Sequence, residues 1–170
     1  NYHTIAVIGP NADSTAALVG NYNGTPPRAI TLLQGISDFC FANNIEVHYA
    51  QGCHLYDNTP PKKPHLGYFV TEGVIAAEHS DLAILCVGLD AGLEGEQGDR
   101  GNQFPSGDKS DLLLPETQRT LIEAVAKTGT PFILVNASGS PIDLSAYEEQ
   151  AKAILQVWYP GGEGGRAVAD

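Results

Sequence analysis

The sequence predicts an α/β fold, an αβα sandwich built around a mostly parallel sheet of five to six strands. Three observations lead to this prediction. Short β-rich runs alternate with helical segments along the chain, which is the pattern of parallel βαβ units. One run, 82–87, is apolar at every position, as expected for a central strand buried on both faces. The composition is that of a globular domain, with 42% hydrophobic and 17% charged residues among 170.

Periodicity and turn residues place the elements in order. Strands are expected at residues 4–8, 45–49, 82–87, 132–135 and 153–158. Helices are expected at residues 31–43, 70–79 and 115–127, with a turn and a short helix in 141–150 and a last helix after 160–162. Residues 51–66 contain prolines at 60, 61 and 64 and show no periodicity, so they are expected to form a surface excursion.

The simplest strand order for such a chain is the flavodoxin-like order 2-1-3-4-5. In that order the switch point lies between the first and third strands, and ligands of open α/β sheets bind outside the carboxyl ends of the strands there. The loop 9–13 and the loop that follows residue 87 would then share one site.

The second of these loops is the strongest candidate for chemistry. Its sequence, GLDAGLEGEQGDR at 88–100, is rich in glycine and carries four carboxylates: Asp90, Glu94, Glu96 and Asp99. A rigid strand that ends in a flexible acidic loop is a common location for functional groups in α/β proteins. Asp90 is expected to bond to nearby backbone amides, and Asp99 to form an ion pair with Arg100 that shapes the loop. The spacing of an EF-hand calcium site is absent.

Five segments occur in a recognisable order and cover nearly the whole chain. They are IGPNAD (8–13), GLDAGLEGEQGDR (88–100), LLLPETQ (112–118), NASGSPIDL (136–144) and VWYPGGEGGRAVAD (157–170). Together they resemble the second, C-terminal sandwich domain of glycoside hydrolase family 3. The loop form, with GLD followed by LEGE and DR, is closer to the β-xylosidase and α-arabinofuranosidase members than to the glucosidase members.

The resemblance implies that a preceding barrel domain carries a nucleophilic aspartate and that this domain lends a glutamate as general acid/base. Glu94 is the first candidate for that glutamate and Glu96 the second. Both are kept because Gly95 and the additional segment GNQFPSGDK (101–109) depart from the family pattern. A retaining glycosidase needs two carboxyl groups about 5 Å apart, and the acid must keep its proton near neutral pH.

The implied reaction is double displacement with retention at β-linked xylosyl, arabinosyl or glucosyl ends of plant oligosaccharides. No cofactor is implied. The expected partners are such an oligosaccharide and the barrel domain of the same enzyme, and this chain alone is expected to be inactive. Tyr22 is the candidate for a sugar contact near the cleft. Trp158 and Tyr159 are expected to pack in the core or against another domain.

Charge and hydropathy narrow the choice of partners. The formal net charge is −11, with 20 acidic and 9 basic residues, and this charge would repel nucleic acid and anionic membranes. No apolar run is long enough to span a membrane, and the start of the chain lacks a signal pattern. Both ends look cut from a longer chain. The compartment stays open between the bacterial cytoplasm and secretion.

Two other functional classes remain open, a non-catalytic carbohydrate-binding or structural domain and a nucleotide-binding Rossmann-like domain. The GPNAD loop after the first strand is compatible with a nucleotide-binding domain. The glycine fingerprint is missing, however, and Asp13 places negative charge where a pyrophosphate would lie. Asn11 and Asp13 are therefore expected to fix the loop.

The remaining reactive side chains are expected to be structural. The odd number of cysteines indicates reduced thiols, at Cys40, Cys53 and Cys86. His54 beside Cys53 has no further ligand spacing to support a metal site, and Ser138 lacks the nucleophile-elbow pattern.

Overall fold

The computed structural model describes residues 2–56, 66–94 and 111–170. Within these ranges the chain forms one sheet of five strands, all parallel, in the order β2-β1-β3-β4-β5. The strands are β1 (Thr4–Ile8), β2 (Glu46–Ala50), β3 (Leu82–Gly88), β4 (Phe132–Ala137) and β5 (Ala153–Gln156). The predicted fold class and the predicted flavodoxin-like order are both confirmed.

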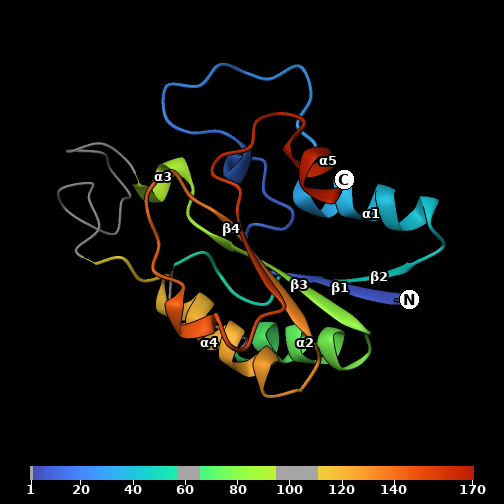
Figure 1. Ribbon diagram of the computed structural model, residues 1–170. Helices are drawn as coiled ribbons and strands as arrows, with labels where there is room; N and C mark the ends of the chain where they lie inside the picture. Colours follow the sequence, from blue (N-terminus) through green and yellow to red (C-terminus); the bar gives the residue numbers. More distant parts are fainter. Residues whose placement is uncertain (1, 57–65, 95–110) are drawn as a thin grey trace.

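Helices cover the two faces of the sheet, as Figure 1 shows. The helices are α1 (Leu32–Ala42), α2 (Leu66–Glu78), α3 (Ala91–Glu94), α4 (Glu116–Ala126) and α5 (Gly164–Ala169), with 3-10 turns η1 (Ala16–Leu18) and η2 (Ser145–Tyr147). Helices α1 and α5 lie on one face, and α2 and α4 lie on the other.

Alternating side chains of the strands divide the core into two apolar clusters. Ile5 and Val7 of β1 face α1, whereas Ala6 and Ile8 face α2 and α4. The central strand β3 is buried on both sides, with only Ile84 partly exposed. The unbroken apolar run in its sequence therefore reflects its place in the middle of the sheet.

Several boundaries differ from the prediction. Helix α2 begins at residue 66, inside the expected excursion, whose residues 57–65 lie outside the described part of the chain. Pro115 caps α4 with extended backbone angles (φ −48°, ψ 145°) instead of being its first helical residue. Strand β5 ends at Gln156, because Trp158 has a left-handed backbone with φ +56° and cannot continue a strand.

The carboxyl end of β3 is held by a buried side chain of α4. Gln118 is fully buried and accepts a hydrogen bond from the Gly88 amide at 2.8 Å. Its own amide donates to the Gly88 carbonyl at 2.7 Å and to the Leu55 carbonyl at 2.6 Å. Gly88 has φ +133°, and a Cβ there would lie 1.9 Å from the Ala137 carbonyl oxygen. Both features fix the point at which the chain leaves the sheet.

Replacing Gly88 by alanine is expected to lower the free energy of unfolding far more than the same change at Gly129. Gly129 also has positive φ (+79°) but no atom near its missing Cβ, so it measures the backbone cost alone, about 1–2 kcal/mol. Gly88→Ala adds a clash with the backbone of β4. Urea unfolding of both variants measures the difference, and equal losses would contradict this account of Gly88.

Gln118→Leu keeps the size of the side chain but leaves both backbone groups of Gly88 and the Leu55 carbonyl without this partner. Each unsatisfied buried group costs about 1–3 kcal/mol, so losing the partners of the two buried Gly88 groups should lower the free energy of unfolding by about 2–6 kcal/mol. The matched control is Gln34→Leu at an exposed position of α1. Thermal unfolding of the two variants checks the prediction, which fails if they have the same melting temperature.

Candidate active site

The loops after β1 and β3 lie against each other at the carboxyl edge of the sheet. The backbone amide of Asn11 donates to the Cys86 carbonyl at 3.2 Å, and its side-chain amide donates to the Leu89 carbonyl at 2.8 Å. Asp13 accepts a hydrogen bond from the Thr31 hydroxyl at 3.0 Å, and Thr31 in turn caps α1. The predicted loop-fixing roles of Asn11 and Asp13 are confirmed. The two loops are in contact, and that they share one site stays a prediction.

A short helix begins the acidic segment, where the sequence predicted only loop. Asp90 caps α3, because its Oδ1 accepts a hydrogen bond from the Leu93 amide at 2.9 Å. This confirms the predicted bonding of Asp90 to backbone amides. The buried Leu93 fixes the inner side of the helix, and α3 ends at Glu94. Glu96, Asp99 and Arg100 lie outside the described residues.

Among the residues that the structure describes, four donors bond to the carboxylate of Glu94. Its Oε2 accepts from the Gly139 amide at 2.9 Å and from the Tyr159 hydroxyl. Its Oε1 accepts from the Ser140 amide at 2.7 Å and from the Ser140 hydroxyl. The side chain is partly buried. Glu94 thus links the segment after β3 to the turn after β4 and to the chain after β5.

The surroundings of Glu94 fit this arrangement closely. A Cβ at Gly139 would lie 2.8 Å from Glu94 Oε2 and 2.7 Å from Cε2 of Tyr159, so only glycine lets both groups approach. Burial, followed by the hydrogen bond and charge of Glu94, raises the pKa of Tyr159 far above its usual range. The phenol therefore keeps its proton and remains a donor at any ordinary pH.

Ser138 supports the same turn and does not act as a free nucleophile. It is fully buried, and its hydroxyl donates to the Ser140 carbonyl at 2.9 Å. The side-chain amide of Asn136 donates to the Ser138 hydroxyl at 3.0 Å. These bonds shape the backbone that presents the amides of Gly139 and Ser140 to Glu94.

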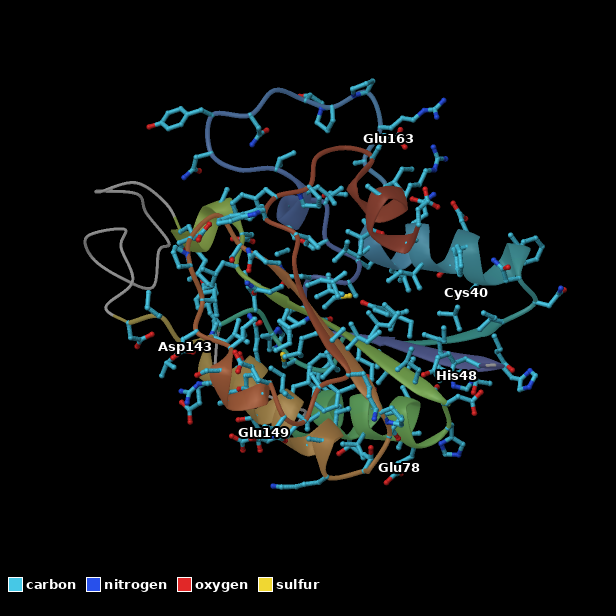
Figure 2. All side chains as sticks on the ribbon, in the orientation of Figure 1. Cys40, His48, Glu78, Asp143, Glu149 and Glu163 are labelled. Atoms are coloured by element: carbon cyan, nitrogen blue, oxygen red, sulfur yellow. The ribbon has the colours of Figure 1, made fainter. Side chains whose placement is uncertain are left out.

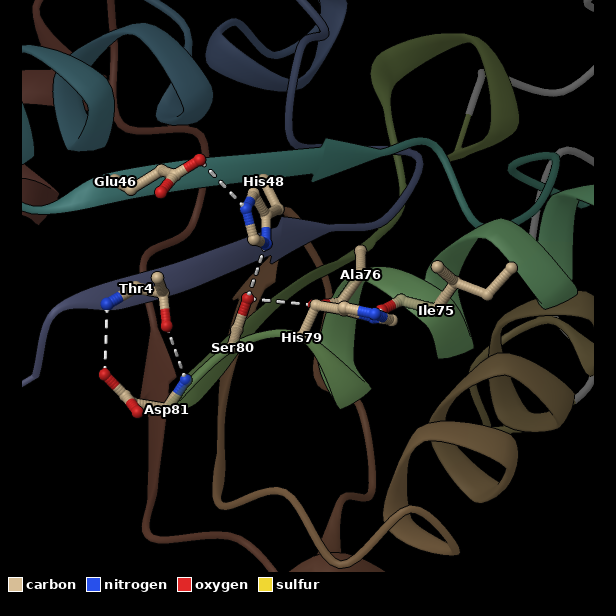
Figure 3. A network of polar contacts seen from close by, with 8 residues as sticks. All are labelled: Thr4, Glu46, His48, Ile75, Ala76, His79, Ser80 and Asp81. Carbon is tan, nitrogen blue, oxygen red and sulfur yellow. Dashed lines mark hydrogen bonds and ion pairs between the residues drawn. The ribbon is translucent and has the colours of Figure 1, made fainter.

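A contact among a serine, a histidine and a glutamate occurs at the amino-terminal edge of the sheet (Figure 3). His48 lies 3.1 Å from the Ser80 hydroxyl through Nδ1 and 3.3 Å from Glu46 Oε1 through Nε2. The Ser80 hydroxyl donates to the Ala76 carbonyl at 2.8 Å, so its proton is already engaged by the end of α2. Nearby, Asp81 accepts from the Thr4 amide at 3.0 Å. This network joins β1, β2 and β3 and is structural.

Most other acidic side chains point to solvent. Figure 2 shows Glu78, Asp143 and Glu149 at the outside of the molecule, on the side of α2 and η2, and all three are exposed. Among the described residues no group of three or more His, Cys, Asp or Glu side chains is arranged to hold a metal ion. Glu94 differs from these carboxylates because protein donors surround it.

The aromatic candidates are separated by the structure. Tyr22 is 91% exposed, and its role as a sugar contact stays a prediction. Of the two predicted positions for Trp158, packing in the core is wrong, because its side chain is 55% exposed after the left-handed turn. Packing against another domain stays a prediction. Tyr159 is half-buried and bonds to Glu94. Glu94 is 65 residues away from Tyr159 in sequence, so no local sequence pattern indicates this contact.

The three cysteines are buried and free, as expected of structural thiols. Burial raises the pKa of Cys53 and of Cys86 to about 12, which keeps both thiols protonated. Sequence reasoning missed Gln118, Gly139 and Ser140. Gln118 carried a usable signal, since a polar residue stands on the apolar face of α4 beside Leu121 and Ile122.

Relatives of known activity match this chain along almost its whole length. A periplasmic β-glucosidase of Salmonella typhimurium is 33% identical over 184 residues, and a β-xylosidase of Formosa agariphila is 34% identical over 173. Each alignment covers 98% of this chain and 22% of the relative, so the chain spans about a fifth of the length of these proteins. No helix among the described residues is long and apolar enough to cross a membrane.

Solved structures give the same result. A family 3 exo-β-xylosidase, determined in complex with a xylobiose aziridine activity-based probe, superposes with a TM-score of 0.82 at 30% identity. The match covers all of this chain and 20% of the xylosidase. The glycosyl hydrolase family 3 C-terminal domain matches residues 1–170. The chain therefore belongs to glycoside hydrolase family 3, as its C-terminal αβα domain.

Proposed function

We propose that this domain supplies the general acid/base glutamate of a retaining, exo-acting glycoside hydrolase of the β-xylosidase type. The nucleophile would come from a barrel domain outside this chain, and the two domains would share one site. The substrates would be β-linked xylo-oligosaccharides, with gluco-oligosaccharides as the alternative, because the relatives include both β-xylosidases and β-glucosidases. The chemistry needs no cofactor.

The observation that carries the proposal is the position of the acidic segment. It leaves the carboxyl end of the central strand β3, at the edge where the loops after β1, β4 and β5 also gather. Ligands of open α/β sheets bind at this edge. A carboxyl group here can reach a sugar held by a neighbouring domain, and the exposed acidic side chains on the helices cannot.

The hydrogen bonds of Glu94 change the preference between the two candidate glutamates. A general acid carries a proton toward the leaving-group oxygen, but the described groups that bond to Glu94 all donate to it. Protonating this carboxyl would break one of these bonds or reverse a bond from a hydroxyl group. The sequence placed Glu94 first; with these contacts we place the acid/base at Glu96 and keep Glu94 as the alternative.

In the proposed reaction the acid first protonates the glycosidic oxygen while the nucleophile of the barrel attacks the anomeric carbon. The same residue, now a carboxylate, then removes a proton from the water that hydrolyses the glycosyl-enzyme intermediate. This residue is dispensable for a substrate whose leaving group needs no proton. That difference is what an experiment can measure.

Glu96→Gln in the full-length protein is expected to lower kcat/KM for xylobiose by about 10²–10⁴-fold, the usual contribution of a general acid. For an aryl β-xyloside with a good leaving group, kcat/KM should fall much less, and azide should restore turnover because it replaces the base-assisted water. Steady-state kinetics on both substrates, with and without azide, measure this.

Glu149→Gln is the control, because Glu149 is an exposed glutamate just after η2. If Glu94→Gln alone shows azide rescue, the acid is Glu94. Full activity of both Glu94→Gln and Glu96→Gln on xylobiose would instead make the domain a structural or carbohydrate-binding module.

A further inference from the structure

We propose that Glu94 is a positioning residue, a latch that fixes the acidic segment to the turns after β4 and β5 through Gly139, Ser140 and Tyr159. This inference rests on the proposed function, because the segment it positions is the one that would carry the acid. The latch is defined as these four residues.

The latch connects segments that follow three neighbouring strands. Glu94 follows β3, Gly139 and Ser140 follow β4, and Tyr159 follows β5, so three neighbouring strands each contribute a part. The contacts join residues 45, 46 and 65 positions apart in sequence. Helix α3 has only four residues and cannot hold its own orientation. The latch gives its last residue a fixed place relative to the sheet.

Both oxygens of the Glu94 carboxylate are occupied by hydrogen-bond donors. Each oxygen of the Glu94 carboxylate accepts from one backbone amide and one hydroxyl group. Hydrogen bonds to a charged acceptor are the strong ones, and two of these donors belong to a rigid backbone turn. Such an acceptor holds its position well. It has no free lone pair directed at a substrate proton.

The neighbouring residues are arranged to receive the Glu94 carboxylate. Gly139 leaves the space that a Cβ would fill, and Ser138 braces the carbonyl of Ser140. Trp158 adopts a left-handed backbone, φ +56°, immediately before Tyr159. Such a conformation costs a bulky residue about 1–3 kcal/mol and persists where the surrounding structure enforces it. Here it directs the chain so that Tyr159 reaches Glu94.

The latch makes a kinetic prediction different from that of an acid. Loss of an acid harms substrates with poor leaving groups selectively, whereas loss of positioning harms every substrate, because the acid and the sugar no longer meet in register. Azide cannot restore alignment. The phenol of Tyr159 stays protonated, so this tyrosine adds no limb to the pH profile.

The test uses the full-length protein with Glu94→Gln, Tyr159→Phe and the double variant. We expect each single variant to lower kcat by about 10- to 100-fold on both the aryl β-xyloside and xylobiose, with little change in KM and no recovery with azide. The double variant should lose less than the product of the single losses, because both changes break one unit.

Two further variants separate positioning from general destabilisation. Tyr147→Phe makes the same chemical change in a buried tyrosine on the other face of the sheet, and it should leave kcat unchanged. Ser140→Ala should behave like Tyr159→Phe, while Ser140→Thr, which keeps the hydroxyl, should recover much of the loss. Melting temperatures show whether every variant is folded at the assay temperature.

If the wild type is active, either of two results overturns the inference and leaves the proposed function intact. One is full activity of both Tyr159→Phe and Ser140→Ala. The other is recovery of Glu94→Gln by azide on the aryl substrate. A wild type that hydrolyses neither substrate refutes the proposed function instead. In that case the latch is tested by the free energies of unfolding of Glu94→Gln, Tyr159→Phe and the double variant. If the double variant loses the sum of the two single losses, the latch is refuted.

Discussion

The structure depends on satisfying the backbone at the buried carboxyl end of β3. Gly88 is the last residue of β3, pairs with Ala137 of β4 and is buried, so its amide and carbonyl must find partners inside the protein. Gln118 supplies both, and the missing Cβ of Gly88 lets β4 approach. Everything that follows along the chain, from the Asp90 cap to Glu94, starts from this fixed point.

Polar contacts at this edge are made mainly by amides and hydroxyl groups. The chain carries a net charge of −11, yet the four donors to Glu94 are all neutral. Neutral donors hold a carboxylate by direction and distance, so the bond is lost if the turn moves by a small amount. A lysine ammonium, a point charge on a flexible stem, would attract the carboxylate over a longer range and fix its position less sharply. The neutral donors therefore fix the position of the Glu94 carboxylate closely.

The sequence predicted the strands, their order and the shared edge, because burial on both faces forces β3 to be apolar and parallel connections force alternation with helices. It did not predict α3, whose four residues depend on the Asp90 cap and the buried Leu93. It also missed the left-handed Trp158 and the contacts of Tyr159. Those arise between segments far apart in sequence, where periodicity carries no information.

One carboxylate is poorly suited to be both anchor and acid. A general acid changes its protonation state and its hydrogen-bond partners twice in each catalytic cycle. An anchor must keep the same partners throughout, because the position of the segment depends on them. Glu94 has the contacts of an anchor, with both oxygens occupied by donors from two neighbouring turns. Under the proposed function, Glu96, two residues further along, would exchange protons while Glu94 keeps its partners.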